Sequence, residues 1–250
     1  MRIDDFLNET REKSRKELLE VSCGGACFEK SFSFKAGEAQ LITIRGGAVE
    51  KAAITRLQLN GFKIPGSEVV TDCVVYQMEV FPENPYCPMG HFNTEWTIGE
   101  ETTYHMNVDL FPAVNVQEDI DGAKEIMDDV AAQFGRDCHG VREGLGIQYN
   151  MEHWDHPLAA RAGFQLKGLS EGDLNLFVTA YKTFFDTYLD IVKKRQNTRF
   201  GEEETRLKHE RNGKWLQYIT QKDRAIKLAQ AIGIPSELLI GLSYPPSAVF

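Results

Sequence analysis

The sequence predicts one α+β domain over residues 1–250, with a large antiparallel β-sheet in its first half and helices packed against it. Two hydrophobic patterns support this fold class. Between residues 27 and 111, apolar and polar residues alternate in short runs separated by turn-forming residues, as in strands joined by hairpins. After Pro112, apolar residues recur every three or four positions, which indicates helices. Because no repeat, linker or low-complexity segment interrupts the chain, we expect a single domain.

Composition excludes several classes of protein. With 42% hydrophobic and 26% charged residues, the chain is typical of a globular protein. Its 28 basic and 37 acidic residues give a net charge of −9, which argues against general nucleic-acid binding. No apolar run is long enough for a membrane helix, and no secretory signal is visible. Five cysteines without metal-ligand spacing are expected to be free thiols, so we expect a cytoplasmic protein.

The first half begins with a charged helix, predicted over residues 3–20. Phe28, Phe32 and Phe34 then alternate with polar neighbours, as in a half-buried strand. Further strands are predicted at residues 41–45, 49–59, 69–81, 92–98 and 103–111. The predicted turns lie at Gly46-Gly47, Asn60-Gly61, Pro65-Gly66 and Gly99. Together these signals predict a sheet built from consecutive hairpins.

The second half is predicted to be mainly helical. Helices are expected at residues 118–134, 174–195 and 223–232. Residues 136–172 are rich in loop-forming residues, with one expected strand at 164–166. A further strand is predicted at 215–220, where aromatic and aliphatic residues alternate with polar ones.

The most informative polar pattern lies in residues 91–111. Because side chains alternate between the faces of a strand, His91, Asn93 and Glu95 share one face. If residues 99–101 form a three-residue hairpin loop, each residue of the first strand lies opposite the residue of the second strand whose number brings the sum to 200. This register keeps the apolar residues of both strands on the same face. The predicted opposed pairs are His91 with Asp109, Asn93 with Asn107, and Glu95 with His105.

Two imidazole–carboxylate pairs on one polar face allow three interpretations. The face can simply be solvated. A histidine beside a carboxylate is held in one tautomer and its charged form is favoured, which suits acid–base catalysis. Two histidines and two carboxylates are also suitable metal ligands. However, His91 and Glu95 lie about 13 Å apart along a strand, so all four cannot share one ion and we expect no metal site.

Other candidate positions have simpler explanations. The segment His153-Trp154-Asp155-His156 lies in a predicted loop and is expected to be exposed. Asp223-Arg224 opens the last predicted helix, where an acidic residue is a common cap. Cys87 has no basic neighbour in sequence and is expected to be a buried structural thiol.

Several motifs resemble the oxygen-dependent coproporphyrinogen III oxidases over residues 46–246. Residues 84–93, NPYCPMGHFN, are similar to the motif N-P-Y-x-P-T-x-H-x-N. Residues 47–54 (GAVEKAAI) resemble G-x-V-F-E-[KQ]-A-G-V, and residues 109–112 (DLFP) resemble D-L-T-P. Residues 188–195 (YLDIVKKR) are similar to Y-L-P-I-V-E-R-R, and residues 211–215 (RNGKW), followed by Asp223-Arg224, are similar to R-R-G-R-Y and the family's Asp-Arg pair. The chain is identified as a divergent member of this family.

The resemblance implies a sheet flanked by helices on both sides, a homodimer, and a tetrapyrrole pocket over one sheet face. It implies conversion of two propionates to vinyl groups, with O2 as co-substrate and no obligatory cofactor. Asp109 and Asp223 would hold or deprotonate pyrrole N–H groups, Arg224 would bind a propionate, and His91 would carry protons. The predicted catalytic residues are Asp109, His91 and Asp223, and the predicted substrate-binding residues are Arg224, Asn93, Glu95, His105 and Asn107.

One departure from the family pattern leaves other functions open. Glu95 stands where the motif H-x-N-x-R has its arginine, so a group that repels carboxylates replaces one that binds them. This change suggests a related pyrrolic, cationic or uncharged substrate. Ferredoxin-dependent bilin reductases, which look structurally akin to these oxidases, offer a second enzymatic interpretation. A non-catalytic tetrapyrrole carrier or sensor is a third.

Overall fold

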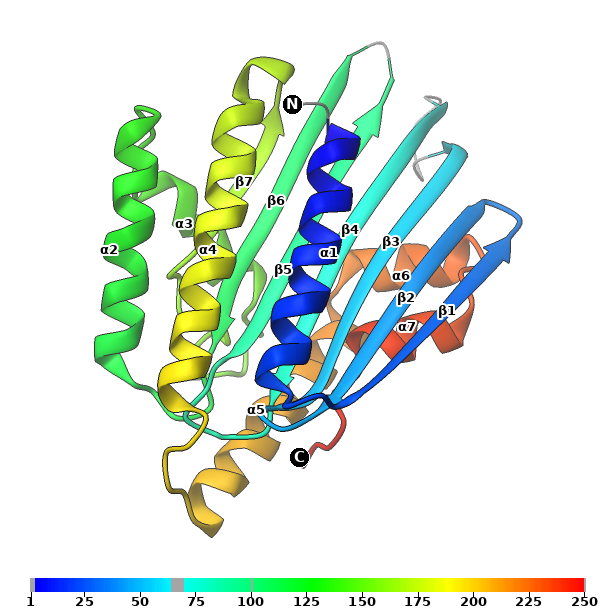
Figure 1. Ribbon diagram of the computed structural model, residues 1–250. Helices are drawn as coiled ribbons and strands as arrows, with labels where there is room; N and C mark the ends of the chain where they lie inside the picture. The colour runs from blue at the N-terminus through cyan, green and yellow to red at the C-terminus, as the bar shows by residue number, and fades with distance from the viewer. Residues whose placement is uncertain (1–2, 64–69, 100, 250) are drawn as a thin grey trace.

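The structure, a computed structural model, describes residues 3–63, 70–99 and 101–249. Seven strands form a single antiparallel sheet in which every strand pairs with its neighbours in sequence, as Figure 1 shows. The strands are β1 (Ala26–Phe34), β2 (Gly37–Gly46), β3 (Val49–Lys63), β4 (Val70–Pro82), β5 (Met89–Ile98), β6 (Thr102–Phe111) and β7 (Phe164–Leu169). Helices cover both faces of this sheet, so the α+β fold class expected from the sequence is confirmed.

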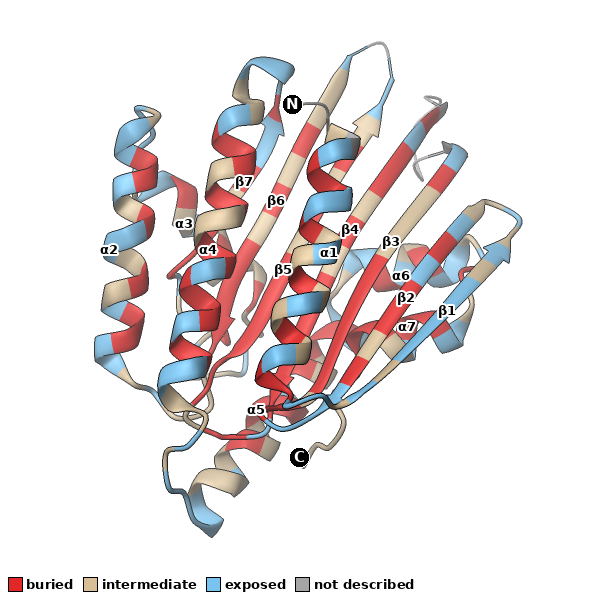
Figure 2. Cartoon of the chain, viewed as in Figure 1, coloured by how far each residue is buried: buried red, intermediate tan, exposed pale blue. Residues whose placement is uncertain are grey.

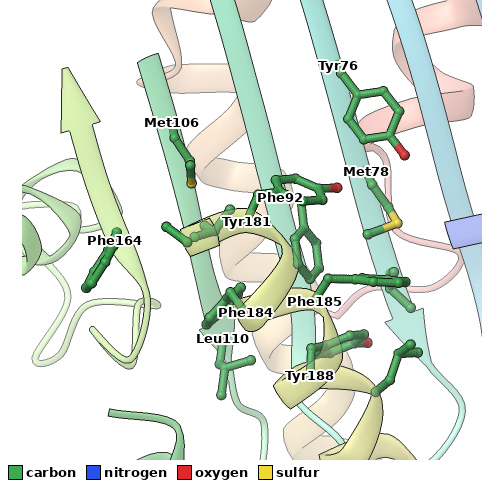
Figure 3. Close-up of a cluster of buried hydrophobic side chains, with 14 of the residues drawn as sticks. Tyr76, Met78, Phe92, Met106, Leu110, Phe164, Tyr181, Phe184, Phe185 and Tyr188 are labelled. Carbon is green, nitrogen blue, oxygen red and sulfur yellow. The ribbon is translucent and has the colours of Figure 1, made fainter. Parts of the chain in front are cut away.

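Two long helices pack on one face of the sheet, and a third packs beside them. They are α1 (Ile3–Val21), α4 (Leu174–Arg195) and α2 (Gln117–Gln133), of which α2 lies against α4. Phe92 from β5 is surrounded by Tyr181, Phe184, Phe185 and Tyr188 from α4, at ring-centroid distances of 5.5 to 5.8 Å (Figure 3). Burial of these aromatic rings fixes α4 across the middle of the sheet.

Four shorter or more polar helices cover the opposite face. They are α3 (Gly140–Gln148), α5 (Glu202–Gln221), α6 (Arg224–Ala231) and α7 (Ser236–Ser243). Their apolar side chains, such as Trp215, Ile226 and Leu238, form a second buried cluster with residues of the sheet. The strands are therefore largely buried between two helical layers, as the burial colours in Figure 2 show. No helix in the described ranges is long and apolar enough to cross a bilayer.

The turn predicted at Asn60-Gly61 is wrong. β3 (Val49–Lys63) continues through these residues, and its pairing with β4 shifts register between Leu59 and Phe62. Gly61 has a φ of +57°, so the glycine serves a bulge in the strand instead of a hairpin turn. The turn predicted at Pro65-Gly66 lies outside the described residues.

The strand predicted at residues 215–220 is also wrong, because this segment ends the helix α5. Three glutamates in the first turn of α5 stabilise its start, and buried positions then recur every three or four residues. Lys208, Arg211 and Asn212 occupy some of these buried positions, so hydrophobicity alone does not reveal the helical period. Helices α3 and α7 fall where the sequence predicted none.

Candidate active site

A band of polar side chains crosses the strands β4 to β7 on the face covered by α3 and α5 to α7. One row contains Glu79, His91 and Asp109 on three adjacent strands. The next row contains Gln77, Asn93, Asn107 and Gln165. All three opposed pairs expected between β5 and β6 are present, so the predicted register of this hairpin is confirmed.

His91 makes its hydrogen bonds away from Asp109, although the two residues are opposed. Its Nδ1 lies 2.8 Å from Oε1 of Glu79, and its Nε2 lies 2.7 Å from the hydroxyl of Tyr149. The expected His91–Asp109 contact is therefore replaced by a Glu79–His91–Tyr149 chain. The side chains of Glu79 and His91 are only 0% and 5% exposed, so this chain is buried.

Oε1 of Glu79 has two partners in this chain. Gln77 Nε2 donates to it at 2.8 Å, and Nδ1 of His91 donates to it in the tautomer that carries its proton on Nδ1. Tyr149 then donates to Nε2 when the imidazole is neutral and accepts from it when the ring is protonated. Burial raises the pKa of Tyr149 well above its usual range, which keeps its hydroxyl protonated.

Aromatic rings enclose the imidazole of His91. The ring of Phe111 stacks on it with a distance of 5.5 Å between ring centroids. The rings of Tyr149 and Trp215 have centroid distances of 5.1 and 5.6 Å from the imidazole. Trp215 is fixed in turn by a hydrogen bond from its Nε1 to the Ser243 carbonyl oxygen at 2.7 Å. These contacts allow the ring little freedom to rotate and leave its two hydrogen bonds to set its orientation.

Asp109 is fully buried and accepts three backbone hydrogen bonds. The amides of Arg161, Ala162 and Gly163 donate to its carboxylate at 2.9, 2.8 and 3.0 Å. Burial raises the pKa of Asp109, and these backbone donors oppose that effect. The carboxylate thus holds the segment that leads into β7 against β6.

Asp223 lies at the start of α6 and interacts electrostatically with the chain around His91. Its Oδ1 accepts a hydrogen bond from the Ala225 amide at 2.7 Å, so it caps the helix. Burial raises the pKa of Asp223, and the nearby charge of Glu79 adds to this effect while that of His91 opposes it. The next residue, Arg224, is exposed and has no hydrogen bond or ion pair within the described ranges.

Glu95 and His105 are opposed but have different partners. His105 Nδ1 accepts a hydrogen bond from the Gly168 amide at 3.2 Å. Glu95 faces Cys73, and burial together with this carboxylate raises the pKa of the Cys73 thiol to about 12. The described residues hold no cluster of three or more histidine, cysteine, aspartate or glutamate side chains arranged for a metal ion.

A cavity of about 130 Å³ adjoins the polar band and lies between the sheet and the helices α6 and α7. Thr55, Gln77, Asn93 and Glu95 form its polar wall. Ile226, Leu228, Leu238 and other apolar residues from α6, α7 and the sheet form the rest. Asn93, Glu95, His105, Asn107 and Gln165 are half-exposed, so the polar band also reaches solvent beside β7.

Sequence reasoning missed Glu79 and Tyr149. Glu79 carried a usable signal, because Gln77 and Glu79 are the two polar residues that alternate within the apolar run of β4. Tyr149 follows the unpredicted helix α3 and had no such signal. The exposed position expected for His153 and His156 is confirmed.

A comparison with known protein families gives a match. A family model described as coproporphyrinogen III oxidase matches residues 5–250. The match covers nearly the whole chain and includes every residue of the polar band. The chain therefore belongs to the coproporphyrinogen III oxidase family.

Proposed function

We propose that this protein is an oxidoreductase that oxidatively decarboxylates a propionate-bearing tetrapyrrole or a related pyrrolic substrate. Family membership supports the reaction class. The observation that carries the proposal is the buried Glu79–His91–Tyr149 chain, flanked by Asp109 and Asp223, on the sheet face. O2 serves as co-substrate, and the protein's own groups handle protons without an obligatory cofactor.

The reaction requires a defined set of atoms and electrons to leave the substrate. A propionate becomes a vinyl group when it loses CO2 and the equivalent of a hydride from the carbon next to the ring. O2 accepts that hydride equivalent and one proton, which gives hydrogen peroxide. The protein has to hold the pyrrole ring, bind the carboxylate and transfer the proton.

Each part of the site suits one of these tasks. Asp223 has a raised pKa and lies where α6 meets the polar band, so it can hold a pyrrole N–H or accept its proton. Arg224 is exposed and can bind a carboxylate with its guanidinium group. His91 can pass a proton between its two ring nitrogens, because a hydrogen-bonding group occupies each side.

The size of the cavity indicates how the substrate would lie. At about 130 Å³, it is smaller than the roughly 300–1,000 Å³ typical of sites that enclose a whole ligand. We therefore place the bulk of the tetrapyrrole along the half-exposed side chains of Asn93, Asn107 and His105. Only the reacting pyrrole ring would enter the cavity, beside Gln77 and Glu95.

Glu95 favours a second candidate function, in which the same fold acts on a cationic or uncharged pyrrolic substrate. Its carboxylate borders an apolar cavity and has no basic ion-pair partner among the described residues. Such a group would attract a protonated amine and repel a propionate. The Glu95→Arg variant separates the two candidates, since it should improve turnover of a propionate substrate only under this second function.

The decisive experiment is aerobic incubation with coproporphyrinogen III, with products read by mass spectrometry. A reaction without protein is needed because porphyrinogens oxidise in air. Protein-dependent loss of CO2 and two hydrogens for each converted propionate would support the proposal. Tight, stoichiometric binding without turnover would instead support a carrier, and unchanged substrate without binding would contradict both.

Variants test the assigned roles. His91→Gln and Asp223→Asn should each lower kcat/KM by about 10²-fold, a typical contribution of a group that transfers a proton. Asp190→Asn is the matched control, because Asp190 is exposed on α4 and has no hydrogen bond or ion pair in the described ranges. Equal activity in Asp223→Asn and Asp190→Asn would contradict the role given to Asp223.

A further inference from the structure

A second hollow lies outside the polar band, between α2, α5 and the segment that precedes β7. Its volume is about 420 Å³, within the range of sites that enclose a small ligand. Ile120 from α2, Leu158 from the loop and Leu207 from α5 contribute apolar surface. We call this hollow the α2–α5 groove.

Four basic side chains line the α2–α5 groove: Lys124, Arg161, Arg211 and Lys214. The one acidic side chain in its lining is Glu210, which already forms an ion pair with Arg206. This local excess of positive charge stands out in a chain of net charge −9. A basic groove on an acidic protein attracts anions against the overall repulsion of the molecule.

None of these four basic side chains forms an ion pair within residues 3–63, 70–99 and 101–249. Lys214 lies over the ring of Trp154 at 5.7 Å. Arg211 is only 4% exposed, and its Nη1 donates to the Phe111 carbonyl oxygen at 2.7 Å. Its Nη2 is buried without a hydrogen-bond partner among the described residues. A bound anion would compensate charge that the fold leaves uncompensated.

A neighbouring hollow of about 380 Å³ extends this basic region. It shares Lys124 and Arg161 with the α2–α5 groove and adds Arg142 and Glu143. Arg142 is already held by Asp128. Lys124 and Arg161 therefore lie between the two hollows, where one ligand could contact both side chains.

We propose that the α2–α5 groove binds an organic polycarboxylate, an anion with an apolar body and at least two carboxylates. Carboxylates would form charge-assisted hydrogen bonds with Lys124, Arg161 and Lys214. The apolar body would lie against Ile120, Leu158 and Leu207. This site shares no lining residue with the cavity below α6, so it does not depend on the proposed reaction.

The test is calorimetric titration with trimesate, the tricarboxylate of benzene, with inorganic phosphate titrated in parallel. We expect saturable binding of one trimesate, weakened by added NaCl because the contacts are charged. The double variant Lys124→Gln/Lys214→Gln should raise the trimesate Kd by about tenfold, since each lost charge-assisted contact weakens binding several-fold. Lys16→Gln, at an exposed position on α1, should leave the Kd unchanged.

Three results would overturn the proposal. One is the absence of saturable trimesate binding to the unaltered protein. Another is equal binding by the double variant and Lys16→Gln, with circular dichroism showing that all three proteins are folded. The third is phosphate binding as tight as trimesate binding, because the apolar wall would then have no part in recognition.

Discussion

The Glu79 carboxylate and the Tyr149 hydroxyl bind opposite nitrogens of the same imidazole, at 2.8 and 2.7 Å from His91. The two groups come from distant parts of the chain, and both are buried. A carboxylate on one side and a phenol on the other allow the imidazole to exist in two protonation states without losing either hydrogen bond.

Replacing Glu79 with glutamine should lower turnover by at least about tenfold, because a neutral amide replaces the carboxyl group that holds Nδ1 of His91 at 2.8 Å. The amide oxygen can still accept from Nδ1, so the ring should keep its place. The measurement is the pH profile of kcat/KM, in which the variant should be less active than the unaltered protein. Glu38→Gln, at an exposed position on β2, should behave like the unaltered protein, and an unchanged Glu79→Gln profile would contradict the prediction.

Tyr149→Phe removes one buried hydroxyl and keeps the ring that packs on Phe111 and Tyr218. Loss of the hydrogen bond to His91 should reduce the free energy of unfolding by about 1 kcal/mol, as measured in urea. It should also shift the NMR signals of the His91 imidazole, whose Nε2 loses its partner. Tyr244→Phe is the control, since the described residues provide no hydrogen-bond partner for its hydroxyl. Equal effects of the two substitutions would mean that the contact with His91 contributes nothing.

Lys51 should make stability increase with pH above neutrality. Burial lowers its pKa to about 7, with Arg45 adding to this effect and Glu79 opposing it. The unfolded chain, with an ordinary lysine pKa of 10.5, therefore binds one more proton than the folded chain above pH 7. The free energy of unfolding should rise by up to about 1.4 kcal/mol per pH unit between pH 7 and 9 from this residue.

Comparing urea denaturation of the unaltered protein and Lys51→Met at pH 7, 8 and 9 isolates this contribution, because other titrating groups cancel in the difference. The stability difference between the two proteins should change steadily with pH. Lys16→Met, at an exposed position, should show a constant difference. A constant difference for Lys51→Met as well would show that Lys51 is protonated in the folded protein throughout this range.

Two glycine substitutions should differ in how strongly they destabilise the protein. An added Cβ at Gly163 would lie 1.9 Å from the Val108 carbonyl oxygen, which is fixed backbone of β6. We expect Gly163→Ala to reduce the free energy of unfolding by about 2 kcal/mol or more and to disturb the loop held by Asp109. At Gly144 the closest atom is the end of the flexible Gln165 side chain, so Gly144→Ala should cost far less. Thermal denaturation of both variants tests this contrast.

The sequence predicted the sheet and the β5–β6 register because both depend on local information. Side-chain alternation and turn residues determine which residues oppose one another within a hairpin. The opposition of His91 and Asp109 was therefore predictable. The hydrogen bonds of His91 were not, because the choice between Glu79 and Asp109 depends on three strands and on the backbone amides that already occupy Asp109.

The second helical layer was harder to predict for a different reason. Helix α3 contains three glycines in nine residues, and α5 buries Lys208, Arg211 and Asn212. Neither helix has the apolar stripe that identifies α4 in the sequence. Tyr149 follows the last turn of α3 and extends from there into the site. Because the sequence did not predict α3, it did not predict the position of Tyr149 either.

The strand order has a consequence for how the site is assembled. Strands β1 to β6 follow one another in the chain without an intervening helix and each pairs with the next, and contacts between residues close in sequence form quickly. Glu79, His91 and Asp109 lie on three consecutive strands, so two hairpins bring them into one row. All three residues precede α5, α6 and α7 in the chain, so this row is synthesised before the helices that cover it. The row of Glu79, His91 and Asp109 would then form early in folding, and the C-terminal helices would cover it last.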